Sequence, residues 1–254
     1  GMHSFNKWPG KFGKIHPEYF ALQPDGTRKN SNVQGGHVCM SNPEVVRETA
    51  NEKTEFFKTS RDLFSPVMPG DSLEIFDCQC PECRAKIVYN KGQSTHSNAV
   101  WGFVNLVAAK VAKTSPGKYI TCCAYGEYAR RPDFSLQPNI AVTLCFPNPP
   151  STANKDAWLQ WLDEWKNSGA RLYVWEYWRA RCSRGVYGAP AMAMHSFREY
   201  FMLDRGIVQG RVLELCPNDT NGRSRDGWTD WIYDVPNLFT AARLMWNPDD
   251  DVDA

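Results

Sequence analysis

The sequence predicts an α/β fold, a (β/α)8 barrel of the TIM type, from three observations. Short runs of β-type residues alternate with longer segments that repeat apolar residues at helical spacing, which is the pattern of βα units around a parallel sheet. Several of the short runs are apolar throughout, as expected when both faces of a sheet are covered. The length of 254 residues suits a single domain of this kind, covering residues 1–254.

Five runs predict the strands of this sheet, because each is rich in β-branched, aromatic or other apolar residues and is bounded by turn-forming or polar residues. In chain order they are Leu63 to Met68, Tyr119 to Ala124, Ile140 to Phe146, Leu172 to Tyr177 and Ile207 to Leu215.

Helical spacing predicts five helices around and between these strands. The first begins at Asn42-Pro43-Glu44, because Pro is favoured at the first helical position and an acidic residue near the positive end. The predicted helices run from Asn42 to about Lys58, from Ser97 to Lys113, from Lys155 to Asn167, from Pro190 to Asp204 and from Pro236 to Trp246.

Five strands do not close an eight-stranded parallel barrel, and an open parallel edge is a liability that proteins usually cover. The opening residues His3-Ser4-Phe5 look like the exit of a further strand. We therefore expect an incomplete barrel, whose first strands come from an upstream continuation of the gene or from a partner.

The charge balance and the missing motifs exclude several function classes. With 29 Lys and Arg against 28 Asp and Glu, the formal charge of +1 gives no field that would attract nucleic acid or an anionic membrane. No apolar run approaches the ~18 residues that a membrane helix needs. The sequence also lacks a Walker-type glycine loop, a dinucleotide-binding glycine fingerprint and a nucleophile-elbow serine motif. We expect a neutral or locally recognised partner, with no nucleic acid and no membrane span.

Nine cysteines are many for such a chain, and their odd number argues against a simple disulfide framework. Cys78, Cys80 and Cys83 form a Cys-x-Cys-x-x-Cys cluster, which together with Cys39 could offer four thiolates to zinc. A disulfide within this loop and free thiols in a packed loop are the alternatives, and free thiols are the preferred interpretation. None of the three makes the cluster catalytic, so the predicted active site contains no metal.

Barrel enzymes place their working groups at the C-terminal ends of strands, and four carboxylates fall there. Glycosidic cleavage needs a proton donor for the leaving oxygen and a second group that stabilises or attacks the anomeric centre, and two carboxylates in unlike environments can divide these roles. Glu176 suits the acid or an orienting role, because Trp175 and Tyr177 flank it and a carboxyl among aromatic rings keeps its proton more readily. The candidate catalytic residues are Asp71, Glu127, Glu176 and Glu214.

Each of these carboxylates has a structural alternative, since a strand-end carboxylate often caps the next helix or pairs with an arginine. The alternative is strongest for Glu127, which Arg130 and Arg131 follow closely. Aromatic rings and a histidine near the same strand ends predict substrate binding, although such rings are also common in cores. The candidate binding residues are His3, Tyr125, Trp175, Tyr177 and Trp178, whereas Trp101, Trp158, Trp161 and Trp165 lie on predicted helices and are expected to pack.

Seven segments together resemble the DUF4838 group of bacterial proteins, whose members include glycoside hydrolase family 163. Their shared order along almost the whole chain is more specific than any one segment. They are His3-Ser4-Phe5, His16-Pro17-Glu18-Tyr19-Phe20-Ala21-Leu22, Cys39-Met40-Ser41-Asn42-Pro43-Glu44-Val45, Cys78-Gln79-Cys80-Pro81-Glu82-Cys83-Arg84, Ala124-Tyr125, Leu172-Tyr173-Val174-Trp175-Glu176-Tyr177 and Leu244-Met245-Trp246-Asn247-Pro248-Asp249.

The resemblance implies a (β/α)8 barrel and a retaining glycoside hydrolase, similar to endo-β-N-acetylglucosaminidases that cut complex N-glycans with help from the acetamido group of the substrate. On that template His3-Ser4-Phe5 would close the third strand, and the five predicted strands would be the fourth to the eighth. Asp71 would hold the acetamido nitrogen, and Tyr125 or Tyr177 would steady its oxygen. The resemblance also implies no cofactor, an oligosaccharide or glycoprotein glycan as partner, and a location in the periplasm or at the cell surface.

A second function stays an alternative: a non-catalytic carbohydrate-binding or scaffold module derived from such a barrel. The missing strands favour this alternative, because an incomplete barrel would keep aromatic stacking but lack a competent acid pair. The strand-end carboxylates favour the enzyme.

Overall fold

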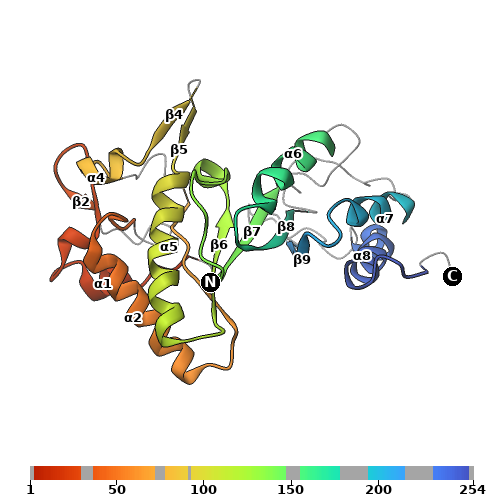
Figure 1. The fold of residues 1–254 in the computed structure, drawn as a ribbon, viewed down its shortest axis with the longest axis horizontal. Coiled ribbons are helices and arrows are strands. Elements are labelled where there is room, and N and C mark those ends of the chain that lie inside the picture. The colour runs from red at the N-terminus through yellow and green to blue at the C-terminus, as the bar shows by residue number, and fades with distance from the viewer. Residues whose placement is uncertain are drawn as a thin grey trace. The chain divides into compact units, whose positions relative to one another are not determined.

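The protein has an α/β fold with a parallel sheet of five strands in the order β3-β6-β7-β8-β9 (Figure 1). The computed structural model describes residues 3–29, 37–71, 78–90, 93–146, 155–177, 194–214 and 231–251. The five predicted strands are confirmed, and two of them have the predicted bounds. They are β3 (Phe64–Pro66), β6 (Tyr119–Ala124), β7 (Ile140–Phe146), β8 (Arg171–Tyr177) and β9 (Val208–Glu214).

Helices alternate with these strands, as the apolar spacing predicts. The helix predicted to begin at Pro236 begins instead at Trp231 and continues through the proline. The helices are α1 (Trp8–Phe12), α2 (Pro43–Thr59), α4 (Pro81–Arg84), α5 (Ser97–Thr114), α6 (Lys155–Lys166), α7 (Met194–Leu203) and α8 (Trp231–Trp246). Two antiparallel pairs, β1 (Ala21–Leu22) with β2 (Arg28–Lys29) and β4 (Val88–Asn90) with β5 (Gln93–Thr95), and two 3-10 turns, η1 (Pro17–Tyr19) and η3 (Gly126–Tyr128), complete the described elements.

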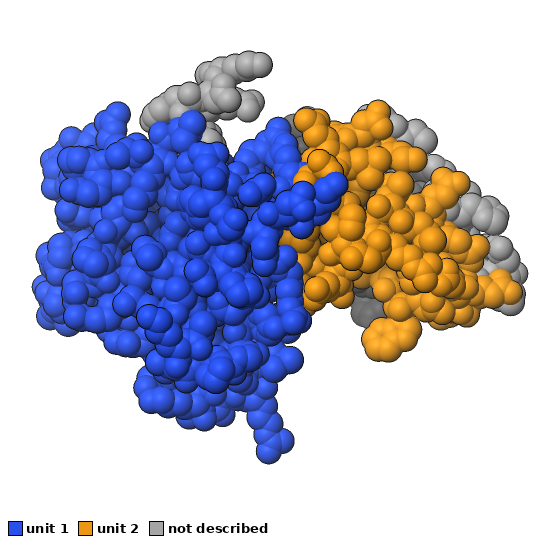
Figure 2. All heavy atoms as spheres, in the orientation of Figure 1, with its two compact units in different colours: residues 1–144, 164–171 blue, residues 145–163, 172–254 orange. Residues whose placement is uncertain are grey.

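The chain divides into two compact units, residues 1–144 with 164–171 and residues 145–163 with 172–254 (Figure 2). The first unit contains β3, β6 and most of β7, and the second contains nearly all of β8 and the whole of β9. The sequence predicted one domain over the same residues. No helix within the described residues is long and apolar enough to cross a lipid bilayer.

Helix α2 shows how local sequence sets an element of the first unit. The side chain of Asn42 accepts a hydrogen bond from the backbone N–H of Glu44, which satisfies one of the free donors at the helix start, and Pro43 occupies the first turn. Val45 and Val46 lie on the buried face. Through this face α2 packs along α5 (Figure 1).

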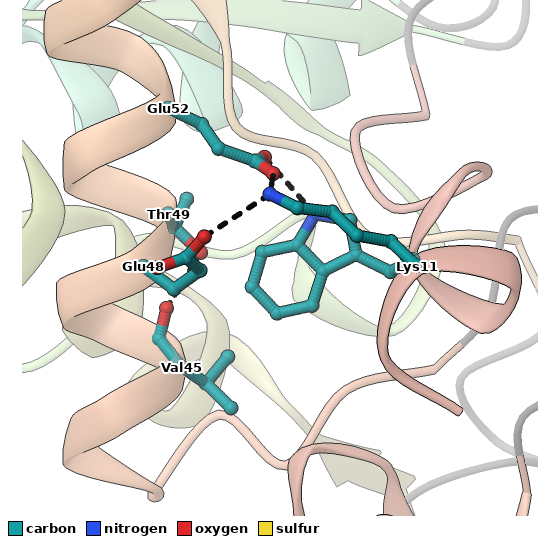
Figure 3. A network of polar contacts seen from close by, with 6 residues as sticks. Lys11, Val45, Glu48, Thr49 and Glu52 are labelled. Atoms are coloured by element: carbon teal, nitrogen blue, oxygen red, sulfur yellow. Dashed lines mark hydrogen bonds and ion pairs between the residues drawn. The ribbon is translucent and has the colours of Figure 1, made fainter. Parts of the chain in front are cut away.

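Aromatic side chains fill the first unit near α1, where Phe5, Trp8, Phe12 and Tyr19 are all buried and in mutual ring contact. Trp8 donates its indole N–H to Glu52 on α2 over 3.0 Å. Lys11 binds the other oxygen of Glu52 at 2.7 Å and Glu48 at 3.1 Å (Figure 3). Burial lowers the pKa of Lys11, but the hydrogen bonds that Lys11 donates to Glu52 and Glu48 outweigh it and raise the pKa above its ordinary value.

Tryptophans connect α5 with the turn that follows β6. Trp101 on α5 is fully buried and donates its indole N–H to the carbonyl of Tyr128 over 3.0 Å. Trp165 is equally buried, lies edge to face against Trp101 at 5.1 Å, and donates to the carbonyl of Ala129 over 3.1 Å. The prediction that the helical tryptophans pack in the core is confirmed, and these two fix the exit of β6.

In the second unit, α7 packs on β9 through a buried ion pair. Arg211 on β9 binds the Asp204 carboxylate just after α7, and the side chains of the two residues are 6% and 3% exposed. The guanidinium also lies 4.8 Å from the centre of the Tyr200 ring and 4.7 Å from that of Phe201. Trp158 of α6 is fully buried and contacts the ring of Tyr200, so α6 and α7 share this core.

Candidate functional site

The carboxyl ends of β3 and β6 form one edge of the sheet in the first unit. The two strands are parallel, with Pro66 opposite Thr121, and the N–H of Val67 extends the pairing by donating to the carbonyl of Thr121 over 2.8 Å. Asp71 follows β3, while Tyr125 and Glu127 follow β6. Because parallel strands leave a sheet at the same edge, all three residues belong to the exit edge of the first unit.

The opening residues of the chain are bound to the exit of β3. Ser4 donates its backbone N–H to the carbonyl of Met68 over 3.0 Å, and its hydroxyl accepts from the N–H of Met68 at 3.0 Å and donates to the carbonyl of Pro66 at 2.9 Å. Residues 4–7 form a turn rather than a strand. These opening residues therefore lie beside the exit of β3. That they close a third strand of a barrel stays a prediction.

This arrangement brings two candidate site residues, His3 and Asp71, together. The Nε2 atom of His3 lies 3.8 Å from Oδ2 of Asp71, and their side chains are 27% and 35% exposed. The Nδ1 atom of His3 lies 2.9 Å from the carbonyl oxygen of Pro69. A carbonyl oxygen only accepts, so Nδ1 carries the hydrogen of this contact and Nε2 is the nitrogen that faces Asp71. The pair combines a carboxylate and an imidazole ring, both partly exposed.

Tyr125 precedes the turn η3 as its N-cap residue, directly after β6, and Glu127 lies within the turn. Both side chains are partly exposed. The backbone carbonyl of Glu127 accepts from the N–H of His96 over 2.9 Å. Of the two arginines that the sequence offered to Glu127, Arg130 forms an ion pair with Glu164.

His96 is a residue that sequence reasoning missed. It is buried, with 5% of its surface exposed, and it occupies the N-cap position of α5 next to the Glu127 backbone. A histidine just before a predicted helix was the signal available, but the sequence could not show that this helix starts beside the exit of β6.

The remaining candidates belong to the second unit. The backbone register of the parallel pair β8 and β9 places Glu176 opposite Leu213 and Tyr177 opposite Glu214. Trp175, opposite Val212, is half-buried. The side chains of Glu176, Tyr177 and Glu214, and the whole of Trp178, lie outside the described residues. Their predicted roles stay predictions.

The first unit holds a second cluster of reactive side chains, away from the sheet. Cys39, Cys78, Cys80 and Cys83 are all buried, and their four sulfur atoms lie within 4.8 Å of one another. The sulfur of Cys39 is 3.7 Å from that of Cys80 and 3.9 Å from that of Cys83, so these thiols are free rather than bonded. The sequence spacing anticipated this grouping and favoured free thiols over a disulfide or a zinc site.

The sulfurs strongly perturb one another's acidity. Hydrogen bonds from the Cys39 and Cys83 thiols lower the pKa of Cys78 to about 2. Burial raises the pKa of Cys80 to about 12, and hydrogen bonding to Cys39 and Cys78, added to burial, raises the pKa of Cys83.

The family model described as "Domain of unknown function (DUF4838)" matches residues 1–254. The chain belongs to the DUF4838 family. The family resemblance of the sequence motifs is thereby confirmed. Among curated proteins, no match to this DUF4838 chain is found.

Among solved structures, the chain is similar to the crystal structure of a GH20 exo-β-N-acetylglucosaminidase from Vibrio harveyi in complex with N-acetylglucosamine. The sequence identity is 10% and the TM-score 0.37, a level too low to establish a shared fold. The match covers 91% of the DUF4838 chain but only 39% of the Vibrio enzyme, so the chain spans well under half of that protein.

Proposed function

We propose that this DUF4838 chain is a retaining glycoside hydrolase that acts on glycans containing N-acetylglucosamine. The observation that carries the proposal is the pairing of His3 with Asp71 at the exit of β3, half-exposed and on the edge that also carries Tyr125 and Glu127. Working groups of α/β barrel enzymes gather at this end of the strands. We place the activity in the periplasm or at the cell surface, in keeping with the family resemblance of the sequence.

In the proposed reaction, Asp71 accepts a hydrogen bond from the acetamido N–H of the substrate, and the Tyr125 hydroxyl donates to the acetamido oxygen. That oxygen attacks the anomeric carbon while the glycosidic oxygen leaves with a proton from a second carboxyl group. A water molecule then gives a proton back to the carboxylate that lost one, and its oxygen attacks the anomeric carbon and breaks the bond to the acetamido oxygen, so the anomeric configuration is retained. Asp71 balances the positive charge that develops on the bound acetamido group, and His3 holds Asp71 in place.

Glu176 is the first candidate for the proton donor, because Trp175 and Tyr177 flank it in the sequence. Glu127 and Glu214 are the other strand-end carboxylates that could take this role. In this proposal Asp71 stabilises the acetamido group, and a different carboxyl group donates the proton to the leaving oxygen.

Hydrolysis of defined N-glycans by Asp71→Asn and Glu176→Gln tests the assignment. Each variant should lose about 100-fold or more in kcat, the usual contribution of a positioned acid or base. The matched control is Asp62→Asn, because Asp62 is exposed at the opposite, amino end of β3, where its carboxylate accepts a hydrogen bond from the Ser60 hydroxyl. Full activity in both site variants would show that the site is misassigned. Glycan binding by the unmodified chain without turnover would favour the non-catalytic binding module.

A further inference from the structure

The four buried cysteines meet where three segments of the first unit converge. Cys39 precedes α2, Cys78 follows the exit of β3 at a distance along the chain, and Cys80 and Cys83 bracket the start of α4. With Ala21 of β1 they form a core of their own, in which Leu22 is the other apolar contact. Sulfur therefore makes up most of this small core.

The sulfur spacing matches a tetrahedral metal site. A Zn–S bond is about 2.3 Å long, so two thiolates on a tetrahedral zinc ion lie about 3.8 Å apart. The separations of 3.7 Å and 3.9 Å agree with that edge, and all four sulfurs lie within 4.8 Å of one another, whereas a disulfide would require about 2.05 Å. We propose that Cys39, Cys78, Cys80 and Cys83 bind one zinc ion as a tetrathiolate site.

The surroundings supply what such a site needs. Zinc with four thiolates carries excess negative charge, and hydrogen bonds to the sulfurs offset it. The backbone N–H of Leu22 donates to Cys78 over 3.2 Å. Ser41 lies 3.2 Å from the Cys83 sulfur, and the ammonium group of Lys86 donates to the Ser41 hydroxyl over 3.1 Å. When Cys83 is a thiolate, the Ser41 hydroxyl donates its hydrogen bond to the sulfur. The ammonium group of Lys86 then stabilises the negative charge of the site through Ser41.

Four protein sulfurs complete the zinc coordination, so the site is structural rather than catalytic. It ties β1, the start of α2 and α4 together, and α4 comes after β3 and Asp71 in the sequence. The apolar contacts of this small core contribute little by themselves, so metal binding would supply much of the free energy that orders the segment.

The metal content of the purified chain is the direct test. Elemental analysis should give about one zinc per chain, and replacing the zinc by Co²⁺ should produce the sulfur-to-cobalt charge-transfer and visible bands of a tetrahedral thiolate site. Cys83→Ala should lower the affinity for Co²⁺ by about 100-fold or more, because a metal ligand is lost. The same substitution at Cys123, a buried cysteine of β6 outside the cluster, should leave one metal per chain.

Three results would overturn the proposal: no zinc and no cobalt bands in the unmodified chain, equal metal content in the two variants, or a mass showing a disulfide among the four cysteines. If Cys83→Ala does not fold, the cobalt titration of the unmodified chain decides alone. None of these measurements depends on glycan hydrolysis, so the outcome is independent of the proposed activity.

Discussion

Glu52 shows how much a single side chain can determine in this fold. One of its oxygens accepts from the indole of Trp8, which is only 2% exposed, and the other binds Lys11, whose side chain is 48% exposed (Figure 3). The ion pair lies near solvent and contributes little. The buried indole N–H contributes more, because it has no access to water if its acceptor is removed.

We therefore predict that Glu52→Leu lowers the free energy of unfolding by about 1–2 kcal/mol, the cost of a buried donor without an acceptor. The matched control is Glu55→Leu on the same helix, because Glu55 pairs only with exposed Lys58 in the described contacts and should change the value by less than about 0.5 kcal/mol. Urea unfolding measures both. Equal effects of the two substitutions would contradict the assignment.

At the scale of single residues, the sequence identified candidate site residues better than it identified which of them are in contact. Asp71 was a candidate because it follows a strand, and the four cysteines because of their spacing, but the contact of His3 with Asp71 joins residues far apart in the chain. No local pattern encodes such a contact. Likewise, the spacing of Cys78, Cys80 and Cys83 allowed three states, and only the sulfur distances to Cys39 favour metal binding.

Among the helices and strands, the sequence predicted the bounds best for strands that are apolar and largely buried along their length. β6 and β7 are apolar along their length, and their predicted bounds agree with the structure. The short antiparallel pairs β1 with β2 and β4 with β5 were missed, because two or three residues of mixed polarity carry no periodic signal. The start of α8 was misplaced, because Pro236 was taken to mark the first turn although the helix passes through it.

The turns from helix to strand offer an element-scale prediction. Gly169, between α6 and β8, has φ +87°, and a β-carbon there would lie 2.9 Å from the carbonyl oxygen of Leu136. Gly117, between α5 and β6, has φ +80° with no atom within 4 Å of that position. Alanine at either site is strained by about 1 kcal/mol in the left-handed region. Gly169→Ala should cost at least about 1 kcal/mol more, because a backbone carbonyl cannot easily move.

Thermal unfolding of the two alanine variants separates strain from steric clash. A larger fall in Tm for Gly169→Ala is expected, with Gly117→Ala as the control for the left-handed backbone. The prediction fails if both variants lose the same stability.

For the whole molecule, the sequence predicted the α/β fold class but did not show whether the parallel sheet closes into a barrel. Alternating strands and helices predict a parallel sheet, and the structure confirms five such strands. Closure into a (β/α)8 barrel depends on the relation between parts that are distant in the chain, and it stays a prediction. The two compact units have separate cores, one built on α2 and α5 and the other on α7 and β9.

Separate cores predict separate local stabilities. Arg211→Met removes the cation that binds the buried Asp204 carboxylate and should cost about 3 kcal/mol. Hydrogen exchange should then accelerate in the backbone amides of α7 and β9, while those of α2 and α5 keep their protection. Arg205→Met is the control, because Arg205 pairs with Asp249 on the surface. Uniform acceleration across both units would instead show one cooperative core.

The distribution of buried indole rings has a practical consequence for spectroscopy. Trp8, Trp101 and Trp165 are buried in the first unit and Trp158 and Trp161 in the second, whereas Trp246 is 92% exposed. Each unit thus carries intrinsic fluorophores shielded from water, whose emission shifts to longer wavelength when that unit opens. Trp246 is accessible to a dissolved quencher such as iodide even in the native protein, so single tryptophan-to-phenylalanine replacements would assign each optical signal to its unit.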